Sequence, residues 1–262
     1  MCTPAHARCA DEICIGREIH NYNSSVYRAL VFAPTKSRFT YDISLSAVSD
    51  YVSRGISGSA SRPAIQGGAD VNYAFSSNIS LAAGIWSSNV YIPAQQATKE
   101  EIDSSVTSVV KTNYGVLTLT AVDYDYPGVH HDLGYNGVEF KVRLDHDLDS
   151  ALALYSTATY FVAFANVDAY GQYFELGMRR ASGHNLFDLG LDTHAGHLWF
   201  ERHHVLAIAD YYEYGLNVFR DWDGFEISLG ITSSNLTQAN CFGGLKICGT
   251  RLVGSLTRVF SW

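Results

Sequence analysis

The residue types that could do chemistry gather in a histidine-rich stretch, "HAGHLWFERHH", and in a shorter "HHD". They are His130, His131, Asp132, His194, His197, Glu201, His203 and His204. Imidazoles and carboxylates can bind zinc or transfer protons. In a strand, however, residues three apart point to opposite faces, so His194 and His197 converge only if the strand ends between them. No serine stands in a Gly-x-Ser-x-Gly setting. We therefore expect solvated loop histidines, no catalytic residue, no metal and no cofactor.

Cysteine supplies a second kind of chemistry. Cys241 and Cys248 bracket "FGGLKI", and in an oxidising compartment we predict a disulfide between them that closes an outer loop. Cys2, Cys9 and Cys14 are spaced by seven and five residues, which matches no common zinc pattern.

The elements that must position these groups follow a period of two, which is typical of strands with two different faces. In "GVEFKVRLDHDLD" the apolar Val138, Phe140, Val142 and Leu144 alternate with Glu139, Lys141, Arg143 and Asp145. The same alternation continues from residue 39 to the end of the chain. It predicts about twelve strands, at 39–56, 64–75, 79–92, 105–114, 116–126, 136–145, 150–164, 169–180, 186–195, 209–219, 225–233 and 250–262.

The composition restricts the fold and the partners. The 262 residues carry a net charge of -8, which argues against general affinity for nucleic acid or anionic lipid. Charged residues make up 17% and aromatic residues 13%, and no run of about 18 apolar residues could form a transmembrane helix. These features favour an all-β fold, a transmembrane antiparallel up-and-down β-barrel of about 12 strands. A soluble sandwich or lipocalin-like barrel also alternates, but it need not end on an aromatic residue.

The predicted connections alternate in length, as they do in outer-membrane barrels with short periplasmic turns. Tight turns are expected at 76–78, 115, 146–149, 182–185 and 220–224, and longer loops at 57–63, 93–105, 127–136, after Ala195 and at 233–249. The connection near 165–169 breaks this rule because it is short.

If the apolar face of each strand meets lipid, most charged side chains point into the lumen, and we predict that they line a pore. The acidic ones are Asp42, Asp50, Asp70, Glu139, Asp145, Glu175, Asp188, Asp192, Glu213 and Glu226, and the basic ones are Arg54, Lys111, Lys141, Arg143, Arg179 and Arg251. Asp50 and Arg54 fall on one face of the first strand. The acidic excess predicts a weak cation preference if water passes. An ion-pair network that only holds the barrel's shape is the alternative.

The opening segments "VSDYVSRGISGSASRPAIQGGADVNYAF" and "AAGIWSSNV" resemble the proteobacterial TorF-type porin family. That family shows SDY-x-x-RG-x-S, PA-x-QGG and G-x-W-x-SN segments, which correspond here to 49–57, 63–68 and 84–89. "YDYPG" and the closing strand resemble it more weakly. The resemblance covers 39–262, and it implies an outer-membrane barrel with a porin-like role and an unspecified solute.

The two ends of the chain differ. The last segment, "RLVGSLTRVFSW", places Leu252, Leu256, Phe260 and Trp262 on one face, which we expect to meet lipid at the periplasmic interface. This segment also resembles the signal that the outer-membrane assembly machinery reads. Residues 1–38 contain only "ALVFA" as an apolar core, too short for a signal peptide. We interpret them as an atypical extension, created by a misassigned start, before a barrel at 39–262.

Two functions follow from this reading. The first is a porin-like channel of the bacterial outer membrane for passive diffusion of small polar solutes, with lipid, solutes and the assembly machinery as partners and no nucleic acid. The second is a structural or occluded barrel that acts through its outer loops, and a barrel enzyme is less favoured. Eight strands leave room only for side chains and sixteen leave a water channel, so twelve predict a narrow or partly plugged pore.

Overall fold

The computed structural model describes residues 15–18, 27–30, 38–129, 135–164, 169–182, 188–201 and 208–262. Within them, twelve strands close into one antiparallel barrel, which confirms the predicted fold. They are β3 (Phe39–Val48), β6 (Ala64–Ala74), β7 (Ile79–Ile92), β8 (Ala97–Thr112), β9 (Gly115–Asp125), β10 (Gly137–Asp147), β11 (Leu152–Phe164), β12 (Ala169–Arg180), β13 (Gly190–Phe200), β14 (Tyr211–Trp222), β15 (Phe225–Ser234) and β16 (Arg251–Ser261).

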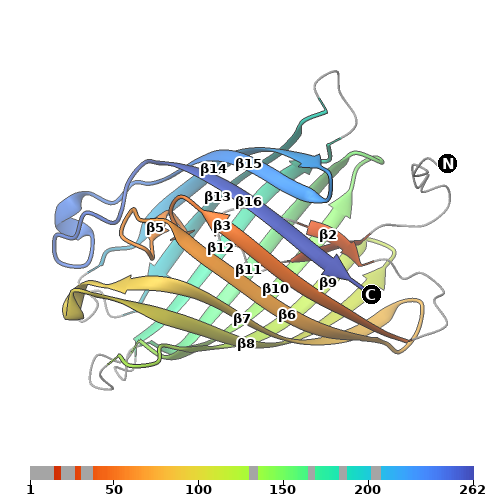
Figure 1. Cartoon of the computed structure of the whole chain (residues 1–262), viewed down its shortest axis with the longest axis horizontal. Coiled ribbons are helices and arrows are strands. Elements are labelled where there is room, and N and C mark those ends of the chain that lie inside the picture. Colours follow the sequence, from red (N-terminus) through yellow and green to blue (C-terminus); the bar gives the residue numbers. More distant parts are fainter. Residues whose placement is uncertain are drawn as a thin grey trace.

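Each strand pairs with its neighbours in the chain, and β16 pairs with β3 to close the barrel (Figure 1). The closing seam extends to the last residue. The backbone N–H of Trp262 donates to the Tyr41 carbonyl at 3.1 Å, and the Tyr41 N–H donates to the Trp262 carbonyl at 3.0 Å. The two rings stack with centroids 6.4 Å apart. The aromatic C-terminus is therefore part of the barrel wall.

Four short strands lie outside the barrel sheet. β1 (Ile15–Glu18) pairs with β2 (Tyr27–Leu30), and β4 (Val52–Ser53) pairs with β5 (Ile56–Ser57). The rest of the predicted N-terminal extension lies outside the described residues, apart from Arg38. Single 3-10 turns, η1 (Pro93–Gln95) and η3 (Gln238–Asn240), occur in two loops. No helix among the described residues is long and apolar enough to cross a membrane.

The outer wall of the barrel is apolar. The buried and exposed positions alternate along β3, β10, β14 and β16, and the exposed ones carry large apolar side chains. Examples are Leu45, 54% exposed, Val106, 59% exposed, and Leu252, 65% exposed. If this surface faced water, its apolar side chains would stay hydrated and would contribute no hydrophobic stabilisation. In lipid, a closed barrel satisfies every backbone group while the same surface meets acyl chains.

The two ends of the barrel differ as expected. Short turns follow β6, β8, β10 and β14 at the end that holds the C-terminus, and the connections after β3, β9, β13 and β15 at the other end are longer (Figure 1). The tight turn predicted at 182–185 is wrong, because the connection from β12 to β13 spans 181–189. One predicted loop is wrong: residues 93–105 are mostly strand, because β7 continues to Ile92 and β8 begins at Ala97. The chain turns there through η1, so the β7–β8 hairpin is longer than the roughly 9–11 residues that a bilayer requires.

Candidate pore lining and constriction

The lumen carries the polar face of the strands. The predicted residues that face it from the barrel wall are Asp70 on β6, Lys111 on β8, Glu139, Lys141 and Arg143 on β10, Glu175 and Arg179 on β12, Asp192 on β13, Glu213 on β14 and Glu226 on β15. Several are nearly inaccessible, among them Glu139, Lys141, Arg143, Asp192, Glu213 and Glu226. Charged groups at this burial must be paired or hydrogen-bonded. The lumen is therefore a packed network of charges.

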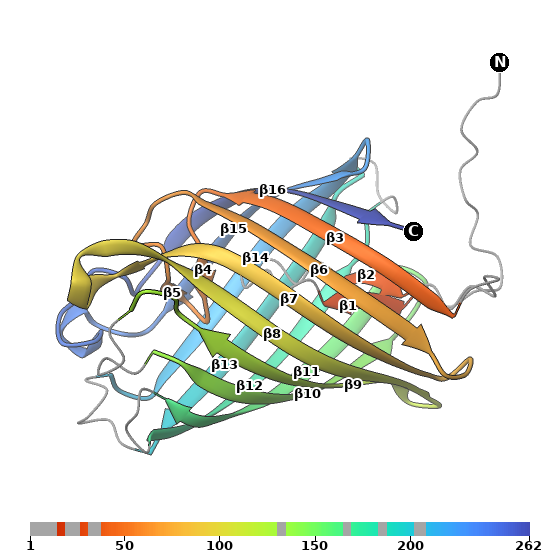
Figure 2. The ribbon, with the colours of Figure 1, turned by 60° about the horizontal axis from the view of Figure 1, so that its bottom comes forward.

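Two of the predicted residues lie elsewhere than expected. Asp50 and Arg54 were predicted on one face of a strand spanning 39–56, but β3 ends at Val48. The chain then folds inward, and β4 and β5 form a small hairpin near the end with the long connections (Figure 2). The sequence alternates through this segment, but the partners of its side chains come from distant strands.

The tip of the inward hairpin is a tight two-residue turn. Arg54 and Gly55 both have positive φ, 48° and 74°, as a type I′ turn requires. A Cβ on Gly55 would lie 3.0 Å from the Glu213 Cβ and 3.1 Å from the Ser233 carbonyl. The hairpin backbone therefore packs directly against β14 and β15, and only glycine fits at this contact.

Arg54 reaches the other side of the lumen. Its guanidinium donates to both carboxylate oxygens of Glu139, at 3.0 and 2.8 Å. It also lies over the rings of Phe161, 4.4 Å from the centroid, and Tyr173, 5.0 Å away. Since Gly55 touches β14 while Arg54 binds β10, the hairpin crosses the lumen. It is the candidate constriction of the lumen.

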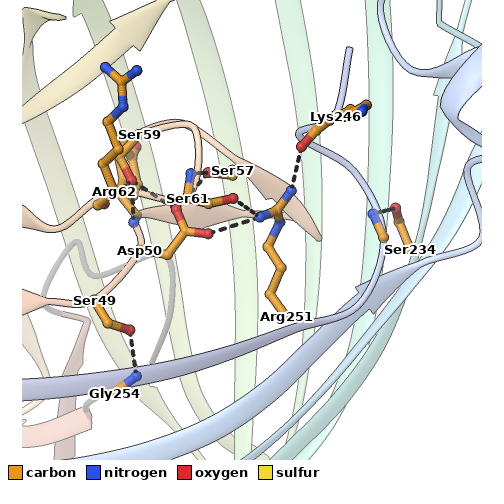
Figure 3. A network of polar contacts seen from close by, with 12 residues as sticks. Ser49, Asp50, Ser57, Ser59, Ser61, Arg62, Ser234, Lys246, Arg251 and Gly254 are labelled. Carbon is orange, nitrogen blue, oxygen red and sulfur yellow. Dashed lines mark hydrogen bonds and ion pairs between the residues drawn. The ribbon is translucent and has the colours of Figure 1, made fainter. Parts of the chain in front are cut away.

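Asp50 fastens the base of the hairpin (Figure 3). It accepts hydrogen bonds from the Ser57 hydroxyl at 2.5 Å and the Ser59 hydroxyl at 2.8 Å. Arg251 on β16 donates to it at 3.2 Å and also to the Ser61 hydroxyl. Asp50 is 5% exposed. It is a buried structural anchor that holds the loop to the barrel wall, not a group on an open pore surface.

Apolar contacts hold the hairpin on both sides. Tyr51 packs in a buried cluster that includes Trp86 and Ile92, and Ile56 packs against a second cluster that includes Tyr211 and Leu236. The Tyr51 hydroxyl donates to Glu101 at 2.7 Å. Side chains from the loop and from the wall thus pack together on both sides of the hairpin.

Two lumen carboxylates were missed. Glu101 and Asp103 fall in the stretch predicted as a loop, yet they lie on β8 and are 4% and 0% exposed. Neither Asp103 oxygen has a hydrogen-bond partner among the described residues. Lys111 was predicted to face inward, and Glu101 and Asp103 lie an even number of residues before it, so continuing the same strand backward would have placed both on the inner face. Their neighbours on the outer face are too polar to reveal the alternation.

The other half of the lumen holds arginine pairs. Arg143 binds Asp145 at 2.8 Å and lies 3.9 Å over the Tyr155 ring. Arg179 lies 3.6 Å from both Asp192 and Glu226. Planar guanidinium groups stack on aromatic rings while they bind carboxylates. The Arg179 pairs join β12 to β13 and β15, whereas Arg143 and Asp145 lie on the same strand.

One predicted pore residue does not reach the lumen. Asp188 lies in the turn before β13, in the left-handed region at φ 55°. Its carboxylate is 45% exposed and lies 3.6 Å from Arg220. Lys111 faces inward but lies near the end of β8 at the same mouth.

The two candidate histidines that the structure describes, His194 and His197, do not converge. His194 faces the lumen from β13, whereas His197 lies on the outer face with its ring centroid 4.1 Å from those of Trp199 and Tyr212. Glu201 lies at an exposed turn. The remaining candidates, His130, His131, Asp132, His203 and His204, lie outside the described residues.

A cavity of 540 Å³ opens beside the constriction. Its lining is largely aromatic and includes Tyr51, Tyr124, Tyr126, Tyr135 and Phe161, with the carboxylates of Glu101 and Glu139. Burial raises the pKa of the Tyr135 hydroxyl, which lies in the loop before β10. This cavity is large enough for a small solute.

A disulfide stabilises the loop beside this cavity. Cys241 and Cys248 are joined, with their Cα atoms 6.1 Å apart. The loop they close supports the inward hairpin, because Ile56 forms a bridge with Cys248 and the Ser57 N–H donates to the Ile247 carbonyl at 2.8 Å.

Comparisons with known proteins agree with the barrel geometry. A family model described as "Bacterial protein of unknown function (Gcw_chp)" matches residues 33–249. No curated protein matches the sequence.

Solved structures share the fold at low identity. The COG4313 outer membrane channel from Pseudomonas putida F1 aligns with a TM-score of 0.53 and 11% identity, over 93% of this chain and 100% of that one. The KdgM porin aligns with a TM-score of 0.51 and 8% identity, over 84% of this chain and 99% of that one. A porin refined at 1.8 Å aligns with a TM-score of 0.42 and 15% identity, over 75% of this chain and 62% of that one.

A closed barrel of twelve strands, an apolar outer wall and a charged lumen are the features of a bacterial outer-membrane protein. The chain is a closed β-barrel of that membrane, and the lumen with its inward hairpin is its candidate functional site.

Proposed function

The chain belongs to the Gcw_chp family of bacterial proteins of unknown function, and we propose that it acts as an outer-membrane porin for passive diffusion of small polar solutes. We also propose that it is a TorF-type porin, on the resemblance of 49–57, 63–68 and 84–89 to that group. We assign it no enzymatic activity, in keeping with the porin and channel names of the similar structures.

One observation supports a polar-solute channel above all. The inward positions of the strands carry ionisable side chains from end to end, including Glu101, Glu139, Glu175 and Glu226. A barrel that served only as a membrane scaffold could fill this space with apolar side chains at lower desolvation cost. Charged linings instead set which solutes pass.

The hairpin sets the proposed size limit. It crosses the lumen from Gly55, which packs against Glu213, to Arg54, which binds Glu139. We propose that solutes enter the 540 Å³ cavity and pass beside the hairpin. Passage is therefore restricted to small molecules.

The contacts of the hairpin also favour a second candidate, an occluded barrel that acts through its outer loops. Buried clusters on both sides of the hairpin and the Arg54–Glu139 pair would have to be disrupted for it to leave the lumen. In that case, water would not cross the barrel.

Liposome swelling distinguishes the two. Proteoliposomes containing the refolded chain are diluted into isosmotic small zwitterions, amines, sugars or nucleosides. We expect swelling that falls with solute size and is absent in protein-free vesicles. An absence of swelling with every solute, for protein that is folded by its heat-modifiable migration, would overturn the porin proposal and favour the occluded barrel.

We further propose that the closing strand is read by the outer-membrane assembly machinery. Its outer face ends with Leu256, Phe260 and Trp262, all exposed toward lipid. This face would be available before β16 pairs with β3.

A further inference from the structure

A cluster of nitrogen and oxygen donors lies in the lumen wall on three adjacent strands. Glu175 on β12, His194 on β13 and Glu213 on β14 each offer one ligand atom, and these atoms all lie within 4.8 Å of one another. His194 Nε2 is 3.1 Å from Glu213 Oε2. Glu213 is 1% exposed, whereas Glu175 and His194 remain partly accessible from the lumen.

Glycines in the sheet make this convergence possible. His194 pairs across the sheet with Gly215, and Gly196 pairs with both Glu175 and Glu213. A Cβ on Gly215 would lie 2.4 Å from the His194 ring. A Cβ on Gly196 would lie 2.7 Å from Glu213 Oε1. The His194 and Glu213 side chains occupy the space above Gly215 and Gly196, where no side chain excludes them, and their polar atoms therefore come together.

The cluster contains two short oxygen–oxygen contacts but only one hydroxyl hydrogen to place in them. The Tyr173 hydroxyl is 2.7 Å from Glu175 Oε2 and 2.6 Å from Glu213 Oε1. A phenol carries one hydrogen and can donate to only one of them. The other contact joins two oxygens without a proton between them, unless a cation or another proton neutralises the site.

The charge of the cluster fits a divalent cation. With a neutral imidazole, Glu175 and Glu213 carry two negative charges. Among the described residues, no lysine or arginine lies within ion-pair distance of either carboxylate, and the more distant Arg54 offsets part of the charge of Glu213. A cavity of 30 Å³ borders His194 and Glu213. It is large enough for about one water, which could complete the coordination.

We propose that Glu175, His194 and Glu213 bind one divalent transition-metal ion of the zinc class. One imidazole with two carboxylates is a ligand set that zinc accepts. Two ligand atoms that each lie about 2.1 Å from zinc are roughly 3.4 Å apart in a tetrahedron. The His194–Glu213 contact, at 3.1 Å, is close to this spacing. The ligand atoms lie up to 4.8 Å apart, so Glu175 has to move inward by up to about 1.4 Å. The Tyr173 hydroxyl then donates to a carboxylate and orients it. The proposal does not depend on transport through the lumen.

The test uses the full chain refolded in detergent, with free thiols alkylated so that the cysteines near the N-terminus cannot bind metal. Zinc is titrated calorimetrically, and cobalt is added separately to record its visible d–d absorption. We expect one equivalent to bind with a dissociation constant in the micromolar range or below. We also expect a cobalt spectrum that zinc abolishes.

Matched variants identify the ligands. Replacing His194→Gln or Glu175→Gln should weaken zinc binding by at least about tenfold. Replacing His197→Gln, on the same strand but the outer face, should leave zinc binding unchanged. Heat-modifiable migration shows whether each variant is folded, and Glu175→Gln serves if His194→Gln is not. No saturable binding at millimolar zinc, or binding that survives both ligand substitutions, would overturn the proposal. The first result would mean that a protonated His194 neutralises the carboxylates instead.

Discussion

Arg54, at the tip of a loop that leaves the barrel wall, binds both carboxylate oxygens of Glu139 on the facing strand β10. The side chains of the two residues are 14% and 5% exposed. Bidentate arginine–carboxylate pairs are the strongest and most directional side-chain contacts. This one joins the inward loop to the barrel wall, and we propose that it keeps the lumen narrow. Lys141, 3.5 Å from Glu139, adds a second positive charge.

Replacing Arg54→Gln should raise single-channel conductance. Removing one partner of a buried pair costs about 3–5 kcal/mol, and Lys141 offsets part of this cost by staying close to Glu139. The hairpin should then leave the constriction more often. Arg62→Gln is the matched control, because Arg62 lies in the same loop but on the exposed side, over the Tyr91 ring. Equal conductance in wild type and Arg54→Gln would contradict the assigned role of the pair.

The lumen should prefer cations weakly. Carboxylates outnumber basic groups on the inner face, and the paired charges, such as Arg143 with Asp145, cancel. Glu175 accepts a hydrogen bond from the Tyr173 hydroxyl and has no ion pair with lysine or arginine among the described residues, so Glu175→Gln should reduce the preference. Glu100→Gln, on the exposed face of β8, should not.

Reversal potentials in a KCl gradient measure this preference, with a chelator present so that bound metal does not mask Glu175. An anion-selective barrel, or identical potentials for wild type and Glu175→Gln, would show that the inner carboxylates do not control permeation.

Removing the disulfide should loosen the constriction without unfolding the barrel. The Cys241→Ser, Cys248→Ser double variant loses a loop closure worth about 2.5 kcal/mol in the chain-entropy model. Ile56 and Ser57 of the hairpin contact this loop directly. We expect faster proteolysis within 235–250 and noisier channel currents, with heat-modifiable migration retained. Unchanged proteolysis and unchanged current noise would show that the disulfide-closed loop does not hold the hairpin in place.

The last residue should contribute to closure. Deleting Trp262 removes two backbone hydrogen bonds to Tyr41, each worth about 0.5–1.5 kcal/mol, and a stacked ring. The urea midpoint of the folded form in vesicles should fall. Tyr114→Ser is the control, because this aromatic residue is 79% exposed in a turn at the same end. A midpoint equal to that of wild type would mean that β16 closes the barrel without its terminus.

The alternation of side chains was sufficient to predict the barrel, because lipid imposes one apolar face on every crossing strand. It failed for β8, whose first residues extend beyond the length that a bilayer requires. There the outward positions Thr98 and Glu100 are polar, so no period of two is visible. Glu101 and Asp103 were missed for this reason.

The constriction could not be predicted for a different reason. Residues 49–57 alternate like a strand, and only contacts with β10, β14 and β16 show that they fold inward. These partners lie as far as 201 residues away in the sequence, as with Asp50 and Arg251. The donor cluster of Glu175, His194 and Glu213 likewise depends on the register of three strands, which the sequence alone leaves undetermined.

Single-channel conductance in planar bilayers tests the central claim most directly, with the wild type compared with a variant in which a short Gly-Ser turn replaces residues 51–60. The account predicts small, discrete conductance steps for the wild type and several-fold larger steps for the shortened loop, with both proteins heat-modifiable. If neither protein conducted current, the proposal of a channel would be contradicted. If both gave equal conductance steps, the inward hairpin would not be its constriction.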